Sequence, residues 1–174
     1  MRIVLFVYTL IALGALLFCS GCRQRSPDAF IFLHPKIEAS QLIVAGKTNL
    51  ADGAVLDYQI DHDSTKTASL DELHELHRQG FSVTSAPLQL HTVVSNNEFR
   101  FTCDVSKFPP GNIEIWVAFQ PFASKAEQPS EILTRYGVKG EYLTGAYVVN
   151  YGELGNRLEC MQDVTYHPGT SLQQ

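Results

Sequence analysis

The sequence predicts an all-β protein, an antiparallel β-sandwich of about seven strands with one short inserted helix. The dominant hydrophobic period is two residues, and turn-forming residues separate the strand-like segments. The composition, 45% apolar and 18% charged, is typical of a folded domain rather than a disordered chain. Short strands joined by frequent turns are typical of sandwiches and barrels.

Alternation of apolar and polar side chains defines the expected strands. The clearest is Ile113–Phe119, in which four apolar residues alternate with Glu114, Trp116 and Ala118. The others are Gln41–Ala45, Ala54–Ile60, Leu88–Val94, Phe99–Val105, Gly145–Tyr151 and Arg157–Tyr166.

Turn chemistry separates several of these strands. Asp52-Gly53 and Asn96-Asn97 suit tight hairpins because Gly and Asn tolerate positive φ. Pro109-Pro110-Gly111 predicts a break between two strands, since proline has no N–H to donate to a ladder.

One segment departs from the β pattern. Ser69 and Glu72 have the spacing of a helix capping box, three leucines at positions 70, 73 and 76 share one face, and Gly80 is placed to end the helix. This predicts a short helix inserted between strands. A further helical turn is expected near Pro129–Tyr136.

The first 22 residues have the order of a secretory signal peptide. Arg2 precedes an apolar run from Ile3 to Phe18, and small residues lead into Cys22. The run is shorter than the roughly 20 residues of a membrane-spanning helix. The terminal Ser-Gly-Cys resembles the lipobox of bacterial lipoproteins, which implies lipidation of Cys22. An uncleaved anchor and an ordinary secreted protein are the alternatives.

We therefore expect a signal peptide over residues 1–21, a flexible tether over 22–29 and a β-sandwich domain over 30–174. The polar stretch after Cys22, Arg23-Gln24-Arg25-Ser26-Pro27-Asp28, has no apolar periodicity. The expected location is the outer side of the cell membrane or the outer membrane, with the lipid anchor as the membrane contact. By the same resemblance, Arg23 favours sorting to an outer membrane where the host has one.

Two cysteines remain after such processing, Cys103 and Cys160. Each falls on the apolar side of an alternating segment. Outside the cytoplasm such a pair commonly forms a disulfide, which we expect here. Two unpaired thiols in the core are the alternative.

Charge and motifs exclude several function classes. The formal net charge is −5, so the chain lacks the basic surface of a nucleic-acid-binding protein. The sequence has no nucleophile elbow, zinc-protease helix motif, phosphate-binding loop or dinucleotide fingerprint. We therefore expect a non-catalytic protein without a cofactor.

The segment around residues 61–80 holds the one cluster with ligand-like chemistry. Imidazoles and carboxylates together can hold a transition metal, and the candidates are Asp61, His62, Asp63, His74 and His77. A calcium loop is disfavoured because Lys66 stands where glycine is needed. A metal- or small-ligand-binding envelope protein using this insert is the alternative function, against a plain solvated insert.

Aromatic residues suggest a contact surface. Trp116 lies on the polar side of its strand, and Tyr136, Tyr142, Tyr147 and Tyr151 gather in the last third of the chain. Exposed aromatics form contact surfaces for an envelope protein or a glycan. The alternative is that the insert or a long connection covers Trp116.

Three segments carry a family resemblance. The stretch from Gly46 to Leu56 and the stretch Tyr136–Gly145 resemble small exported β-sandwich domains of uncharacterised bacterial lipoproteins. Phe108–Ile115 is similar to a segment of transthyretin-like and immunoglobulin-like modules. The resemblance implies a lipid-anchored envelope protein with a binding or structural accessory role, and it implies no chemistry.

Overall fold

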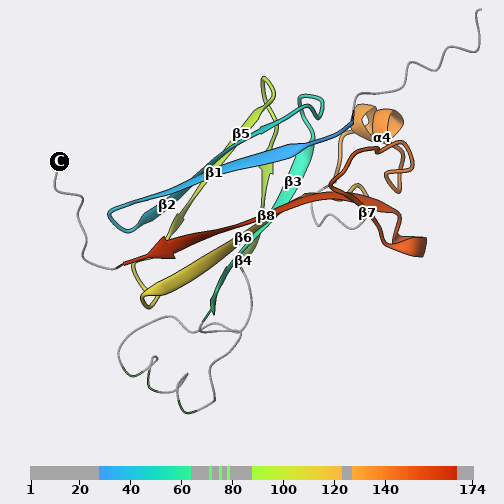
Figure 1. The fold of residues 1–174 in the computed structure, drawn as a ribbon. Helices are drawn as coiled ribbons and strands as arrows, with labels where there is room; N and C mark the ends of the chain where they lie inside the picture. The colour runs from blue at the N-terminus through green and yellow to red at the C-terminus, as the bar shows by residue number, and fades with distance from the viewer. Residues whose placement is uncertain are drawn as a thin grey trace, which may run out of the picture.

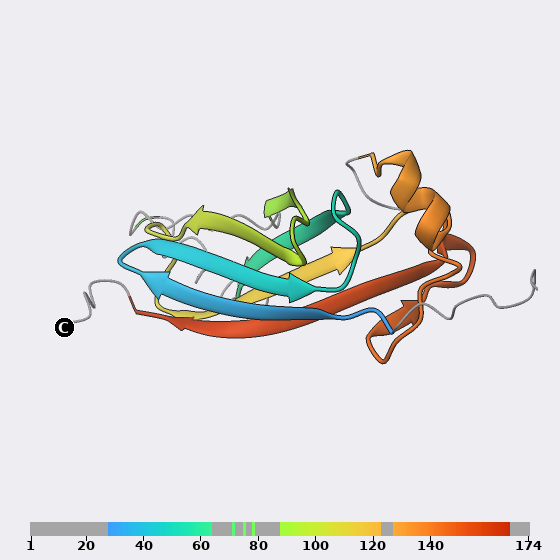
Figure 2. The ribbon, with the colours of Figure 1, turned by 90° about the horizontal axis from the view of Figure 1, so that it is seen from above.

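The computed structural model describes residues 28–63, 88–122 and 127–167, with residues 71, 75 and 78 of the intervening segment. Two antiparallel sheets of three and five strands pack face to face (Figures 1 and 2). This confirms the predicted all-β sandwich, with eight strands instead of about seven.

The three-stranded sheet has the order β1-β2-β5. Its strands are β1 (Ile31–Glu38), β2 (Gln41–Thr48) and β5 (Glu98–Asp104). Inward residues of β2 alternate with outward ones such as Ala45 and Lys47, as expected for a sheet with one solvated face.

The five-stranded sheet has the order β4-β3-β6-β8-β7. Its strands are β4 (Leu88–Val93), β3 (Val55–His62), β6 (Gly111–Phe119), β8 (Asn156–Tyr166) and β7 (Val148–Asn150). The predicted strand Gly145–Tyr151 is reduced to β7, because the chain turns at Gly145 and again after Asn150.

The sequence prediction missed β1. Pro35 and the charged residues Lys36 and Glu38 made this segment a poor strand candidate. The strand forms at the edge of its sheet and pairs only with β2 among the described strands. Proline is tolerated at an edge because one side of the strand needs no ladder donor.

The two predicted hairpin turns carry the chain between the sheets. Asn96 and Asn97 have φ of 54° and 61° and connect β4 of one sheet to β5 of the other. Gly53, with φ of 88°, lies in the crossing from β2 to β3. Ser95 and Glu98 exchange both backbone hydrogen bonds around Asn96-Asn97, so the tight hairpin predicted there is confirmed, although its two arms continue into different sheets. At Asp52-Gly53 the chain does turn, with Ala54 N donating to Ala51 O at 3.1 Å, but β2 and β3 do not pair, so no hairpin forms there.

In the part of the chain that the structure describes, little of the backbone is helical. The predicted turn near Pro129–Tyr136 is α4 (Ser130–Tyr136), and a 3-10 turn, η1, covers Gly152–Leu154. In the insert, residues 71, 75 and 78 are helical, and Arg78 and Glu75 form an ion pair. The capping residues Ser69 and Glu72 lie outside the described residues.

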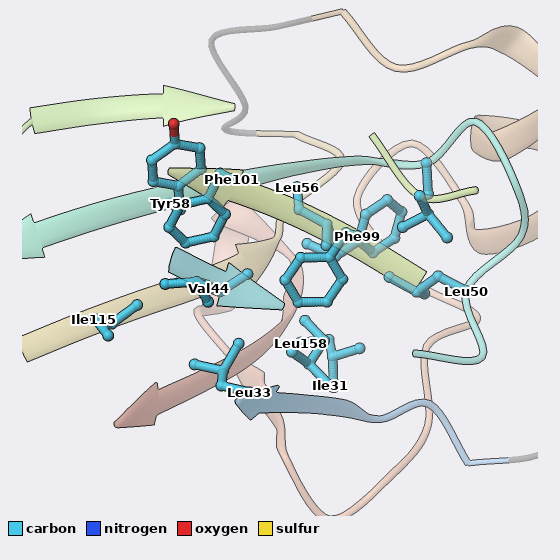
Figure 3. Packing of buried hydrophobic residues seen from close by; sticks show 14 of the residues in the cluster. Ile31, Leu33, Val44, Leu50, Leu56, Tyr58, Phe99, Phe101, Ile115 and Leu158 are labelled. Atoms are coloured by element: carbon cyan, nitrogen blue, oxygen red, sulfur yellow. The ribbon is translucent and has the colours of Figure 1, made fainter. Parts of the chain in front are cut away.

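The core lies between the inner faces of the two sheets (Figure 3). All four inward residues of β6, from Ile113 to Phe119, are inaccessible to solvent, as their alternation predicts. The rings of Tyr58 and Phe101 stack across the sheets, with centroids 3.7 Å apart and planes 6° apart. The ring of Phe99 lies over Gly46, where a Cβ atom would be only 2.0 Å from it.

Cys103 and Cys160 pack against this core, which confirms the faces predicted for them. The expected disulfide between them is not formed, since both are free thiols in the structure. They belong to different sheets, and the Cys103 thiol is directed at the carbonyl oxygen of Asp104, 3.7 Å away. Burial raises the pKa of both thiols.

The two ends of the sandwich differ. The α4 end comprises residues 28–32, 48–54, 94–98, 120–122 and 127–156 and holds α4, β7 and η1 (Figures 1 and 2). The opposite, hairpin end comprises residues 36–42, 60–63, 102–114 and 162–167. The insert begins after β3 at the hairpin end, where His62 pairs with Ile113.

Candidate binding surface

The outer face of the five-stranded sheet carries the aromatic residue that the sequence analysis identified. Trp116 occupies the centre of β6, between the inward residues Ile115 and Val117, so its indole projects away from the core. It is half-buried by side chains of β8 and of the segment after β7.

Glu159 in β8 organises these side chains. Its Oε2 accepts a hydrogen bond from Nε1 of Trp116 at 3.2 Å. Its Oε1 accepts one from the hydroxyl of Tyr151 at 3.1 Å. One carboxylate therefore fixes the positions of both aromatic rings.

Arg157 lies between the two rings. Its guanidinium carbon is 4.2 Å from the ring centroid of Tyr151 and 5.5 Å from that of Trp116. Its Nη1 is 3.6 Å from Oε2 of Glu159. Cation–π contact of this kind favours a planar guanidinium over an ammonium.

Met161 extends this group, the Trp116 cluster, which comprises Trp116, Tyr151, Arg157, Glu159 and Met161. The backbone of Met161 pairs with that of Trp116, and its side chain is 60% exposed. The cluster therefore offers an apolar patch beside a compensated charge pair, a chemistry that suits a contact surface.

Burial raises the pKa of Tyr151, and its hydrogen bond to Glu159 acts in the same direction. The hydroxyl consequently stays protonated at neutral pH and keeps its role as donor to Glu159.

A row of carboxylates lies next to the cluster. Asp61, Glu114 and Asp163 occupy registered positions on β3, β6 and β8. Like charges opposite one another on neighbouring strands are destabilising. Among the residues that the structure describes, however, no three acidic, histidine or cysteine side chains lie close enough to hold a metal ion.

The insert candidates do not come together as one site. His62 is buried and packs edge-on against Phe108, with ring centroids 5.9 Å apart. Asp61 is the next residue on β3 and faces outward, where its Oδ2 accepts a hydrogen bond from Gln59. The two side chains project from opposite faces and do not share a ligand site. Asp63 is exposed, and His74 and His77 lie outside the described residues.

The other sheet contains a feature that the sequence analysis missed. A shallow cavity of about 350 Å³ lies on its outer face and is lined by His34, Ala45, Lys47, Glu98 and Arg100 among others. Ala45 pairs with His34 on one side and Arg100 on the other, so the hollow lies over the short side chain. Finding it requires the register of three strands, which alternation within one strand does not provide.

Cys22 and the tether up to residue 27 lie outside the described residues. Within the described part of the chain, none of the helices has the length and apolar character needed to span a bilayer. The chain from Asp28 onward is fixed to the domain, since Ala29 N donates to Thr144 O at 2.6 Å and Asn49 Nδ2 donates to Asp28 O at 3.0 Å.

Comparison with known proteins adds no assignment. No protein-family model matches the chain, and no curated protein shows significant sequence similarity to it.

Proposed function

We propose that this protein is a lipid-anchored β-sandwich of the cell envelope, held at the membrane through Cys22 and exposed on the extracytoplasmic side. Its role is to bind a partner or to support envelope structure, without catalysis. The observation that carries the proposal is the order of the N-terminal segment, in which a signal-like apolar run leads to Cys22 and then to a polar stretch.

The position of the first fixed residues supports this arrangement. Ala29 joins the domain by a backbone hydrogen bond to Thr144, only seven positions after Cys22. The polar stretch between them therefore acts as a short leash. A single acyl chain holds a protein only marginally, and stable anchoring needs a second chain or a further membrane contact.

The test is metabolic labelling with a fatty acid, combined with membrane fractionation, of the parent and of Cys22→Ser. The parent should incorporate label and fractionate with membranes. Cys22→Ser should lose the label and the processing step. Cys103→Ser is the matched control, because its thiol lies within the folded domain, and it should be labelled like the parent. Equal labelling or equal processing of Cys22→Ser and the parent would contradict the proposal.

For the binding role, the Trp116 cluster is the surface we assign to an envelope protein or glycan. It joins an exposed thioether, Met161, to aromatic rings held by Glu159 and Arg157. Aromatic residues, methionine and arginine are enriched in interfaces.

A photoreactive residue at position 161 of the lipidated chain tests this assignment in intact cells. We expect discrete cross-linked species from position 161, and their loss in a Trp116→Ala background. Position 36, exposed on the outer face of the other sheet, is the control. The same products from both positions would show that the Trp116 cluster is not the binding surface.

A further inference from the structure

Exposed hydrophobic side chains are concentrated at one end of the sandwich. Eleven large hydrophobic residues are exposed in the described part of the chain, and eight of them fall in the α4 end. None falls in the described residues of the hairpin end. We call five of the eight the aromatic rim: Val138, Tyr142, Tyr147, Val149 and Leu154. Tyr151 is left out because its side chain belongs to the Trp116 cluster.

The rim is built from loops whose backbones are fixed to β8. Asn156 N donates to Lys139 O at 2.7 Å, and Tyr151 N donates to Gly155 O at 2.8 Å. The first bond ties the loop after α4 to the start of β8, and the second closes the turn before it. The apolar side chains of these loops nevertheless stay in water, as in Tyr142 and Tyr147, which are 50% and 53% exposed. An exposed patch on a rigid base is typical of a contact surface.

The chain enters the domain at the same end. Ala29 hydrogen-bonds to Thr144, which lies in sequence between the rim positions Tyr142 and Tyr147, and both views show β1 starting at the end of the sandwich that holds α4 and β7 (Figures 1 and 2). From Cys22 to Asp28 the chain advances by six residues, a span of at most about 20 Å. An acyl chain on Cys22 therefore keeps the α4 end close to the bilayer surface.

From this placement we propose that the aromatic rim rests in the headgroup region of the bilayer to which Cys22 is anchored. The inference rests on the proposed lipidation of Cys22. Tyrosine is enriched at membrane–water interfaces because its ring is apolar and its hydroxyl is polar. A leash of about 20 Å at most leaves little room for a protein partner between this end and the lipid.

Charge at this end is mixed. The basic residues Arg135 and Lys139 are outnumbered by acidic ones, which include Asp28, Glu127, Glu131, Glu141 and Glu153. The contact therefore depends on apolar burial more than on attraction to anionic lipid, and it should persist in high salt. In this orientation the strands lead away from the bilayer, and the hairpin end, where the insert begins, faces the aqueous side.

Depth-dependent fluorescence quenching of the full-length lipidated protein tests the proposal. Trp116 is the single tryptophan, so Trp116→Phe provides a silent background. Tyr147→Trp places a probe in the rim, Tyr142→Trp places a second one there, and Gln41→Trp places a matched exposed probe at the hairpin end. The vesicles contain phosphatidylcholine and phosphatidylglycerol, with or without brominated phosphatidylcholine.

We expect brominated lipid to remove most of the fluorescence of Tyr147→Trp and Tyr142→Trp and to leave that of Gln41→Trp unchanged, in low and high salt. Soluble iodide should quench the fluorescence of Gln41→Trp more strongly than that of Tyr147→Trp or Tyr142→Trp. Co-flotation with vesicles without quenching of either rim probe would overturn the rim proposal and leave the lipid anchor standing. Failure to co-float would overturn the lipid anchor and the rim proposal together.

Discussion

The two ends of this sandwich share one core and differ in what they present to their surroundings. The α4 end exposes apolar side chains such as Tyr147 and Leu154, whereas the described residues at the hairpin end expose polar ones such as Lys36 and Asp104. Burial therefore does not explain the difference, since inward residues are inaccessible at both ends. The two ends differ in the side chains exposed by the segments that connect the strands. These connecting segments are therefore where we look for a function of the domain.

The connections also differ in how they are built. At the α4 end, Gly140, Gly145 and Gly155 have positive φ, and an added Cβ at each would meet a backbone oxygen at 2.1–2.5 Å. Close backbone packing of this kind leaves the neighbouring side chains free to face outward. At the hairpin end, turns are formed by polar residues and prolines, with the His62 ring packed beneath Gly111.

The largest effect should come from removing the side chain that joins α4 to the core. Tyr136 is buried, packs edge-on against Phe119 with centroids 5.2 Å apart, and accepts a hydrogen bond from Ala51 N at 2.8 Å. Tyr136→Ala should lower the free energy of unfolding by about 3–5 kcal/mol, measured by urea denaturation.

The control for this substitution is six residues away. Tyr142 is half exposed, so Tyr142→Ala should change the free energy of unfolding by less than about 0.5 kcal/mol. A similar loss from both substitutions would mean that the rim belongs to the core, and the contrast between the ends would disappear.

Next in size is a comparison of two glycines with positive φ. Gly111, at the hairpin end, has φ of 147°, and an added Cβ would lie 2.9 Å from the His62 ring. Gly111→Ala should destabilise the fold by about 1–3 kcal/mol through backbone strain together with this clash.

Gly152, at the α4 end, has φ of 64° and no atom within 4 Å of an added Cβ. Gly152→Ala should therefore cost about 1 kcal/mol through backbone conformation alone. Urea denaturation of both variants gives the comparison. Equal losses would mean that packing of His62 against Gly111 contributes nothing measurable.

Much of the fold could be predicted from the sequence because inward positions alternate strictly in strands such as Ile113–Phe119. The edge strand β1 could not, since Pro35 and two charges obscure its alternation, and a strand at an edge tolerates both. Sheet membership was also beyond the sequence. A turn such as Asn96-Asn97 has the same local chemistry whether it stays within a sheet or crosses between two.

The candidate surface was predicted through Trp116 and Tyr151, whereas the expectation that Tyr136 is also exposed is wrong, because it packs into the core. The Trp116 partners Arg157 and Glu159 are ordinary outward charges of a strand, and only the register of β6 with β8 brings them beside the indole. The prediction that Asp61 and His62 belong to one ligand site is wrong, and again the geometry of the strands is the reason. Adjacent residues of a strand point to opposite faces, so closeness in sequence separates them in space.

A pH titration probes the hairpin end. Burial lowers the pKa of His62, and the nearby charge of Asp63 opposes this only in part. The unfolded chain binds a proton near pH 6.5, whereas the folded chain does so only at lower pH. Stability from this group is therefore complete above pH 6.5 and decreases as the pH falls below it.

His62→Gln should weaken this decrease between pH 7.5 and 5.5, measured by urea denaturation at each pH. His34→Gln is the control, because His34 is exposed on β1 at the outer surface. The free energy of unfolding of this variant should depend on pH in the same way as that of the parent. If His62→Gln keeps the pH dependence of the parent, the titration arises elsewhere.

The smallest difference between the two ends is expected in the reactivity of the two core thiols, Cys103 and Cys160. Cys103 lies toward the hairpin end of β5 and Cys160 toward the α4 end of β8, and both thiols are half-buried with raised pKa. Because the thiolate is the reactive form, both should be alkylated slowly and at similar rates at pH 8. Cys160→Ser and Cys103→Ser isolate each thiol, and mass spectrometry follows the reaction. A much faster reaction at one position would identify the end that opens first.

A second measurement tests for a disulfide. In the parent, unfolding without reductant should make both thiols react fully, whereas a disulfide would protect both. The comparison of the two ends is thus tested in the core that they share.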